Sequence, residues 1–234
     1  MGYKIPAKEI CKFAHENGIL VSIDAAQSAP HMKIDVKDMD CDFLSFSGHK
    51  MCGPTGIGIL YGKFELLNKM DSFLVGGGNN ITYDTGCNVS YLYPPEKFEA
   101  GTLNLAGIYG LYAAIKYLND IGLDNIENYE KELKDYAIKK LSSNKNIIIY
   151  NKDSETGILT FNYNGVFAQD EATYLNSKGI CVRSGQHCAK LLNDYLKTPA
   201  TIRASFYFYN TKQEIDQLAK VLENGGNFLD AYFN

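Results

Sequence analysis

The chain has 234 residues, a formal net charge of −4 at pH 7 and 45% hydrophobic residues, which is typical of a globular protein with one large or two small domains. The negative charge gives no electrostatic support for a nucleic-acid partner, and no apolar run is long enough to span a membrane. The first residues lack the apolar stretch of a secretory signal, and the six cysteines contain no CxxC pair. We therefore expect a cytoplasmic protein with reduced thiols.

The first half of the chain predicts an α/β arrangement. A helix is expected at residues 6–17, because Pro6 suits a first helical turn and Gly18 ends the apolar periodicity. Continuous apolar runs predict strands at 19–23, 42–47 and 56–61. Residues 76–103 have little periodicity, so a long irregular segment is expected there. Two strong amphipathic patterns then predict helices at 105–119 and 124–141.

The second half predicts a smaller α+β unit. Its strands are expected at about 146–150, 157–163, 179–183 and 201–208. Its helices are expected at about 168–177, 188–194 and 211–224, and a short amphipathic tail follows Gly225-Gly226. We therefore expect two domains, residues 1–118 and residues 119–234.

Lys50 and Asp24 are the first candidates for chemistry. Each follows an apolar run, so each is expected near the C-terminal end of a buried strand, where α/β sheets bind ligands. Pyridoxal phosphate (PLP) chemistry needs such a pair: a lysine amine that forms a Schiff base and an acid that holds the ring nitrogen. Apolar surroundings favour the neutral, nucleophilic amine. The alternative is a structural ion pair between Lys50 and Asp24.

Polar neighbours strengthen the cofactor interpretation of Lys50. Ser47 and His49 can donate to a phosphate, and Gly48 lets the backbone approach a ligand. Gln27, three residues after Asp24, can donate to a ring oxygen. Taken alone, His49 fits an ordinary strand-end position better and Gln27 fits a surface helix position better.

The segment 183–189, Arg-Ser-Gly-Gln-His-Cys-Ala, holds the second candidate centre. Arg183, His187 and a following helix would all favour the thiolate form of Cys188, which is the nucleophilic form. Arg203 interrupts an apolar strand, where a guanidinium needs an anion such as a carboxylate. A zinc site built from both His-Cys pairs is disfavoured, because H-x-x-C and adjacent H-C are not the usual ligand spacings.

Four strings occur in order along the chain: Asp24-Ala-Ala-Gln27, Ser47-Gly-His-Lys-Met-Cys-Gly-Pro-Thr-Gly56, Phe98-Glu-Ala-Gly-Thr-Leu-Asn104 and Arg183-Ser-Gly-Gln-His-Cys-Ala189. Together they resemble the PLP-dependent cysteine desulfurases of the class V aminotransferase family, with the short cysteine loop of the SufS-type group. The resemblance implies an α/β fold: part of the large domain of fold-type I PLP-dependent transferases in residues 1–118, followed by a small α+β domain with the cysteine loop.

The resemblance also implies roles. Lys50 would bind PLP covalently and Asp24 would pair with its ring nitrogen, while Gln27, Ser47 and His49 would bind its ring oxygen and phosphate. Thr102 would reach the phosphate of a partner subunit, which implies a homodimer. Arg203 would bind the carboxylate of L-cysteine, and Arg183 and His187 would flank the loop. Cys188 would take the substrate sulfur as a persulfide, release L-alanine and pass the sulfur to a SufU- or SufE-like acceptor for iron–sulfur cluster assembly.

The chain departs from the family pattern mainly in length. It resembles only the C-terminal part of proteins of about 400 residues, so we expect a truncated chain that binds PLP weakly or not at all by itself. Ser184, Gln186 and Leu103 are milder departures. Two alternatives use the same residues: a selenocysteine lyase, and a non-catalytic remnant that dimerises or docks a sulfur carrier.

Overall fold

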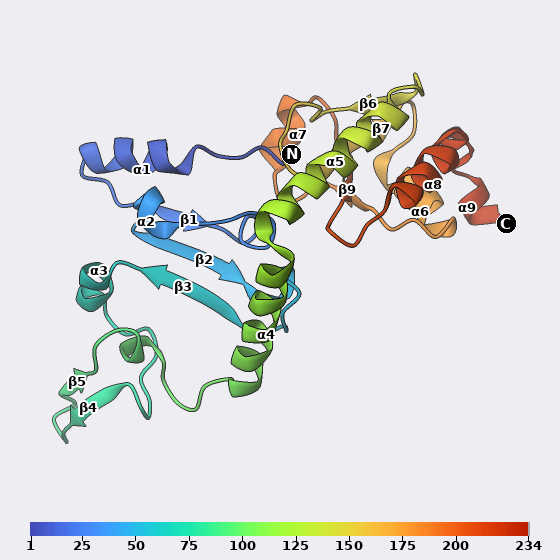
Figure 1. Ribbon diagram of the computed structural model, residues 1–234. Coiled ribbons are helices and arrows are strands. Elements are labelled where there is room, and N and C mark those ends of the chain that lie inside the picture. Colours follow the sequence, from blue (N-terminus) through green and yellow to red (C-terminus); the bar gives the residue numbers. More distant parts are fainter. Residues whose placement is uncertain (234) are drawn as a thin grey trace. The chain divides into compact units, whose positions relative to one another are not determined.

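The computed structural model describes residues 1–233 (Figure 1). They form two compact units, which we name after the candidate residue that each contains. The lysine unit is Pro6–Leu123, and the cysteine unit joins Met1–Ile5 to the chain from Asp124 onward. The functional domains expected at 1–118 and 119–234 stay a prediction. In the described part of the chain, no helix is both long and apolar enough to cross a membrane.

The lysine unit contains a three-stranded sheet in the order β1-β2-β3 and a two-stranded β4-β5 sheet. Strands β1 and β2 are parallel, with Ser22 opposite Phe43, whereas β2 and β3 are antiparallel. The elements, in chain order, are α1 (Ala7–Glu16), β1 (Ser22–Asp24), α2 (Val36–Met39), β2 (Phe43–Ser47), η1 (Gly48–Lys50), β3 (Gly58–Gly62), α3 (Phe64–Lys69), β4 (Asn80–Tyr83), β5 (Val89–Tyr91), η2 (Glu96–Phe98) and α4 (Leu105–Ile121).

Two expectations for this unit need correction. The first strand was expected at residues 19–23, but β1 begins at Ser22 because its neighbour β2 begins only at Phe43. The segment 76–103 was expected to be irregular, but it contains the β4-β5 hairpin. The Asp84 carboxylate shapes the hairpin turn by accepting from the Gly86 and Asn88 backbone N–H groups at 2.8 and 3.0 Å. Two strands this short leave little alternation for a pattern to detect.

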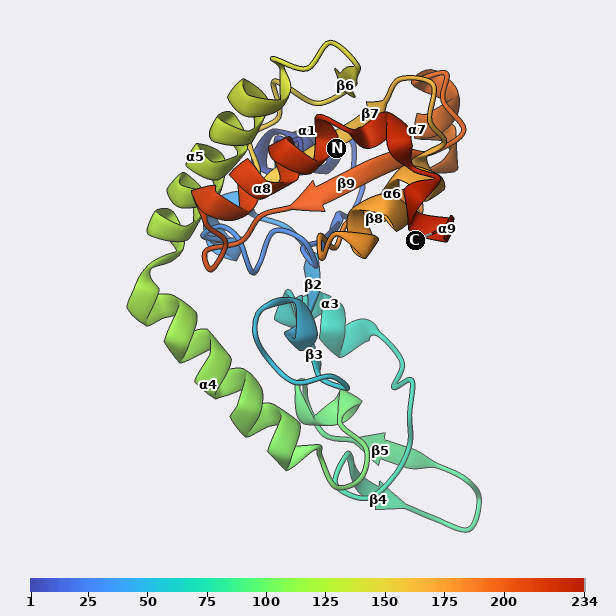
Figure 2. The same ribbon diagram turned by 90° about the vertical axis from the view of Figure 1, so that its right-hand side faces the viewer.

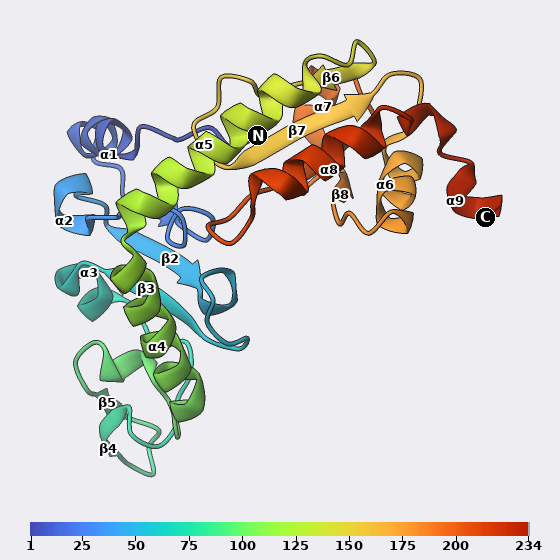
Figure 3. The same cartoon turned by 45° about the vertical axis from the view of Figure 1, so that its right-hand side comes forward.

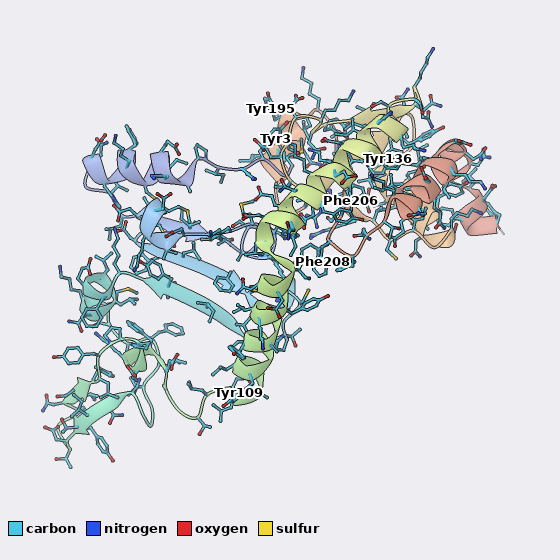
Figure 4. All side chains as sticks on the ribbon, in the orientation of Figure 1. Tyr3, Tyr109, Tyr136, Tyr195, Phe206 and Phe208 are labelled. Carbon is cyan, nitrogen blue, oxygen red and sulfur yellow. The ribbon has the colours of Figure 1, made fainter. Side chains whose placement is uncertain are left out.

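The lysine unit has a small core. One buried cluster consists of Cys11, Ala25, Cys41 and Leu44, and Leu111, Ala114 and Leu118 of α4 are also buried. Several large apolar side chains are exposed instead: Phe13 at 68%, Leu20 at 59%, Leu60 at 58% and Phe73 at 92%. Figure 4 labels Tyr109 on α4, which is 73% exposed.

The cysteine unit is built on a four-stranded sheet in the order β6-β7-β9-β8, and all neighbouring strands are antiparallel. Figure 2 shows α8 and β9 of this unit. The elements, in chain order, are α5 (Leu123–Leu141), β6 (Ile147–Ile149), β7 (Ile158–Tyr163), α6 (Ala168–Ser177), β8 (Arg183–Gly185), α7 (Lys190–Tyr195), β9 (Thr201–Ser205), α8 (Lys212–Leu222), η3 (Gly225–Asn227) and α9 (Asp230–Phe233).

One side of this sheet carries the core. Alternate residues of β7 and β9, among them Leu159, Phe161 and Ile202, are fully buried in one cluster with apolar residues of α5, α6 and α8. Figure 3 shows α5 and α8 along β7. Because side chains alternate along a strand, Arg203 belongs to the opposite side of the sheet. Helix α5 is also bonded to α8, since the Tyr136 hydroxyl, labelled in Figure 4, donates to Asp216 at 2.9 Å.

The strand expected at 179–183 is displaced to Arg183–Gly185. The residues before it terminate α6: the Gly179 and Ile180 N–H groups donate to the carbonyls of Asn176 and Leu175 at 3.0 and 2.9 Å. Their backbone is therefore used to close the helix and cannot pair in the sheet. The apolar Ile180 and Val182 pack against the core from this connection, which explains the strand-like pattern.

Candidate functional site

Lys50 and Asp24 lie at the same edge of the β1-β2-β3 sheet. The two strands are parallel and Asp24 is opposite Ser45, so the C-terminal ends of β1 and β2 coincide. Asp24 ends β1, and Lys50 ends η1, the short helix that directly follows β2. The Asp24 side chain is exposed and the Lys50 side chain is half-buried. Both residues lie at strand ends as expected, at the edge of a parallel strand pair where α/β sheets bind ligands. The expectation of a buried strand before Asp24 is wrong, because the residues of β1 are exposed or half-buried.

Two glycines fix the backbone that presents Lys50. A Cβ atom on Gly48 would lie 2.7 Å from Ile57 Cγ2, and one on Gly53 would lie 2.8 Å from the Gly48 carbonyl oxygen. This closeness permits the bonds that close the loop, from Gly48 N to Ile57 O at 2.9 Å and from Gly53 N to Gly48 O at 3.0 Å. Met51 is buried beneath the loop. The backbone is therefore fixed both before Lys50, at Gly48, and after it, at Gly53.

The ion-pair alternative for Lys50 is wrong. Among residues 1–233, no ion pair joins Lys50 to Asp24. The Asp24 carboxylate instead accepts from the Ala26 backbone N–H at 2.9 Å, within its own turn. The Lys50 amine and the Asp24 carboxylate thus lie at the same edge of the sheet without forming an ion pair with each other.

The remaining expected cofactor residues belong to the same unit. Ser47 is half-buried at the end of β2, His49 is exposed in η1, and Gln27 is exposed in the turn after β1. Thr102 is exposed in the segment before α4. That segment is tied to the loop after Lys50, because the Asn104 amide donates to the Gly56 carbonyl at 3.3 Å.

In the cysteine unit, two arginines lie directly opposite each other. Arg183 of β8 pairs with Arg203 of β9 in the antiparallel register. Like charges at such positions repel each other unless an anion lies between or beside them. No carboxylate of the described residues forms an ion pair with either guanidinium. The nearest sulfur is Cys188 Sγ, 3.8 Å from Arg183 Nη2.

Arg203 carries an unused hydrogen-bond donor. Its Nε is buried and has no partner within the part of the chain that the structure describes. Burial and the charge of Arg183 lower the pKa of Arg203, while Cys188 raises it. A buried donor on a guanidinium without a counterion is costly, so this position is suited to a planar anion such as a carboxylate.

The loop that carries Cys188 is held by His187. The His187 Nε2 atom lies 3.0 Å from the Thr201 carbonyl oxygen, so it donates to that acceptor. Burial lowers the pKa of His187, and Arg203 and Arg183 lower it further, so the ring is neutral at pH 7. The positive charge beside the thiol is therefore that of Arg183, whereas the sequence pattern had assigned the effect to both residues.

The backbone of the same loop is strained at two residues. His187 and Cys188 have φ angles of 50° and 62°, in the left-handed region that residues with side chains rarely adopt. Such positions cost of the order of 1–3 kcal/mol each and are concentrated at functional sites. Cys188 is exposed and lies just before the Ala189 N-cap of α7. The strained loop thus presents an exposed thiol beside a guanidinium.

Sequence reasoning missed two features of this loop. The Thr201 carbonyl that anchors His187 is a backbone group, and no residue pattern identifies it. Arg183 and Arg203 lie opposite each other because of the β8-β9 register, and this register is set only when the strands pair. Within residues 1–233, no three His, Cys, Asp or Glu side chains are grouped so as to hold a metal ion.

Comparison with known proteins identifies the family of the chain. Residues 1–218 match the aminotransferase class-V family. The chain belongs to this family. Over 228 residues it is 49% identical to a probable cysteine desulfurase of Halalkalibacterium halodurans, covering 97% of this chain and 56% of that protein.

Two solved class-V structures have the same fold. The cysteine desulfurase CsdA of Escherichia coli aligns with a TM-score of 0.90 and 37% identity, covering 95% of this chain and 55% of CsdA. The apo cysteine desulfurase of Thermococcus onnurineus aligns with a TM-score of 0.90 and 38% identity, covering 95% of this chain and 56% of the other. The chain spans about half the length of the curated relatives it matches.

Proposed function

We propose that this class-V protein is a cysteine desulfurase that transfers sulfur from L-cysteine to Cys188. The observation that carries the proposal is the buried, unpartnered Nε of Arg203, opposite Arg183 and close to the exposed thiol of Cys188. An amino-acid carboxylate bound to Arg203 would supply the missing anion. It would also bring the substrate side chain towards a nucleophilic sulfur.

The lysine edge fits pyridoxal phosphate as the cofactor. Lys50 has no ion-pair partner among residues 1–233, and its amine is free to bind the cofactor covalently. Asp24 would hold the ring nitrogen, Gln27 the ring oxygen, and Ser47 and His49 the phosphate. When bound, PLP serves as an electron sink that accepts the electron pair left on the substrate carbon.

The sulfur step balances with the residues named. The Cys188 thiolate attacks the substrate sulfur, the bond between that sulfur and the substrate carbon breaks, and a persulfide forms on Cys188. The carbon keeps the electron pair of the broken bond and gains a proton, which gives L-alanine. No external oxidant or reductant is needed. Arg183, at 3.8 Å from the sulfur, stabilises the thiolate before attack.

The persulfide would leave the site on a partner. Cys188 is exposed, so a SufU- or SufE-like acceptor protein can reach its outer sulfur and supply iron–sulfur assembly. Thr102 is also exposed. A residue that binds the phosphate of a second subunit must be exposed in the single chain, so this exposure supports a homodimer. Within residues 1–233 no disulfide joins the six cysteines, which suits the reducing cytoplasm.

A single-turnover experiment tests the proposal. The purified chain is incubated with excess PLP and then L-cysteine, alanine is quantified, and intact mass and peptide masses are recorded without reduction. A parallel sample is treated with borohydride to fix PLP on its lysine. The excess of PLP offsets the weak binding expected of this chain by itself, so we expect PLP on Lys50, one added sulfur on Cys188 and an equal amount of alanine.

Matched variants make the outcome decisive. Lys50→Ala and Cys188→Ser should each abolish the sulfur adduct, whereas Lys69→Ala and Cys181→Ser, which change exposed residues of the same types, should retain it. A sample with PLP fixed on Lys50 but no sulfur on Cys188 would contradict the desulfurase assignment. Failure of borohydride to fix PLP on Lys50 would contradict the cofactor assignment.

A further inference from the structure

Glu171 is a buried acid that the sulfur chemistry does not use. It lies on α6, its relative exposure is 0%, and both carboxyl oxygens are buried with no hydrogen-bond partner in residues 1–233. By contrast, the exposed Glu214 of the same unit has hydrogen-bond partners. Its carboxylate accepts from the Thr211 N–H at 2.7 Å in a helix cap. Burial raises the pKa of Glu171 to about 7. A carboxylate without donors is costly in such a site, so the protonated form is favoured.

The C-terminal segment Gly225–Phe233 covers this acid. Helix α6 packs against η3 and α9, the two elements of the segment. A Cβ atom on Gly225 would lie 2.8 Å from Glu171 Oε1 and 2.6 Å from Tyr163 Cδ2, so only glycine allows so close a cover. The Tyr232 hydroxyl of α9 donates to Asp170 Oδ1 of α6 at 3.1 Å. The segment is therefore seated directly on the carboxyl group.

The charged groups around Glu171 do not offset a negative charge on it. Its pKa responds to burial, with no neighbouring cation contributing. Asp230 of α9 and Glu171 both raise the pKa of Tyr174, so these two acids share a neighbourhood. The charged and titratable groups of the surrounding elements are Asp170, Tyr174 and Lys178 near α6, Tyr163 on β7, Arg183 on β8, Arg203 on β9, and Asp230 and Tyr232 on α9.

None of the cations in this set acts on the pKa of Glu171. Lys178 Nζ lies over the Tyr174 ring, 5.3 Å from its centroid. The charge neighbours of Arg203 are Arg183 and Cys188. An ionised Glu171 would thus meet Asp170 and Asp230 without a compensating cation. Opening the cover would let water solvate the carboxylate.

We propose that Glu171 is a pH-sensitive latch that keeps the segment Gly225–Phe233 closed on α6 when protonated and releases it when ionised. The inference rests on the packing of α6, η3 and α9 and is independent of the sulfur step. The segment contains only the short elements η3 and α9, and short elements of this kind open locally at low free-energy cost, so a single carboxyl group can control such an opening.

The direction of the pH effect follows from the two states. In the closed state the Glu171 pKa is about 7, and in the released state it returns towards the ordinary 4.5. The closed state therefore binds more protons between these values, and closure weakens as pH rises from 4.5 to 7. Above pH 7 both states are ionised and the ratio stops changing. The gap allows a change in the closed-to-open ratio of up to roughly two orders of magnitude.

Hydrogen exchange of the full chain tests the latch. Protection factors, corrected for the intrinsic pH dependence of exchange, are measured for peptides of Gly225–Phe233 at pH 5 and pH 8. Helix α8 serves as the internal reference. We expect protection of the segment to fall by roughly tenfold or more at pH 8 while α8 is unchanged. Unchanged protection of the segment in the wild-type protein would overturn the proposal.

Three variants complete the test. Glu171→Gln and Glu171→Met remove the titrating group, and both should keep the segment equally protected at the two pH values. Glu171→Met secures the test if the buried amide of Glu171→Gln disturbs folding. Glu223→Gln removes an exposed carboxylate just before the segment and should behave as the wild type. The same loss of protection at pH 8 in either Glu171 variant would assign the effect to other groups and refute the latch.

Discussion

Arg183 and Arg203 face each other across the antiparallel pair β8-β9, and neither guanidinium has a carboxylate partner in the described residues. Cys188 Sγ lies 3.8 Å from the Arg183 Nη2 atom. The pair concentrates positive charge on the side of the sheet opposite the core. It therefore prepares the cysteine unit for two anions, a thiolate and a carboxylate.

Replacing Arg183 tests its effect on the thiol. Arg183→Ala should slow alkylation of Cys188 by iodoacetamide at pH 7 by roughly threefold to tenfold, because it removes the guanidinium that lies 3.8 Å from the reacting sulfur. Rates are read by peptide mass spectrometry, with Cys181 as an internal reference. Lys190→Ala, which removes an exposed cation two residues beyond Cys188, should leave the rate unchanged. Equal slowing in both variants would show that the alkylation rate depends on the total positive charge around Cys188 and not on Arg183 in particular.

Replacing Arg203 should stabilise the cysteine unit and remove its ability to bind the substrate carboxylate. Arg203→Met removes a buried guanidinium whose Nε is unpartnered, so we expect the cysteine unit to gain about 1–2 kcal/mol in free energy of unfolding. The same variant should lose sulfur transfer from L-cysteine, since no donor for the substrate carboxylate remains. Urea unfolding and the persulfide mass assay give the two readouts. A destabilised Arg203→Met protein would mean that the guanidinium has a stabilising partner after all.

The sequence predicted the two centres better than it predicted their surroundings. Strand ends and glycines are local features, so Lys50 in its loop and Asp24 at the end of β1 were placed correctly. The β8 strand was misplaced because Gly179 and Ile180 bond back to α6, which apolar periodicity does not reveal. The Arg183–Arg203 pair depends on strand register, and the burial of Glu171 depends on the distant segment Gly225–Phe233. Tertiary packing decides all three.

The glycine at position 48 should not tolerate a side chain. A Cβ atom there would lie 2.7 Å from Ile57 Cγ2 and 3.2 Å from the Ile57 carbonyl oxygen. Gly48→Ala should therefore destabilise the lysine unit by about 1–3 kcal/mol and loosen the loop that holds Lys50. Hydrogen exchange of β2 and β3 measures both effects. Gly77→Ala is the control, since nothing lies within 4 Å of its Cβ position, and a similar loss in that variant would contradict the steric explanation.

His187 should titrate below its ordinary pKa. Burial and two arginines lower its pKa from 6.5. The folded loop therefore binds fewer protons than the unfolded one, so its stability is present above pH 6.5 and declines as pH falls below that value. An NMR titration of the imidazole, assigned by comparison with His187→Gln, measures the shift. A midpoint at or above 6.5 would mean that the bond to the Thr201 carbonyl, which raises the pKa, outweighs burial and the two arginines.

Asp42 should stabilise the lysine unit in a pH-dependent way. Burial raises its pKa, but bonds from His15 at 2.8 Å, from the Val21 N–H at 2.7 Å and from Lys63 outweigh burial and lower it to about 2. The ordinary value is 3.8, so the stabilisation is present above pH 3.8 and is lost as pH falls towards 2. Its size at neutral pH is about 2 kcal/mol.

Asp42→Asn should remove at least this contribution, because the amide has no negative charge and presents an NH2 group in place of one of the two oxygens that accept from His15 and Lys63. Asp38→Asn provides the control: Asp38 pairs with Lys8, but both side chains are 60% exposed, so the loss should stay below about 0.5 kcal/mol. Urea unfolding of both variants and the wild type at pH 7 and pH 3 measures the difference. The wild type should lose stability relative to Asp42→Asn at pH 3, and an equal gap at both pH values would show that Asp42 does not titrate within this network.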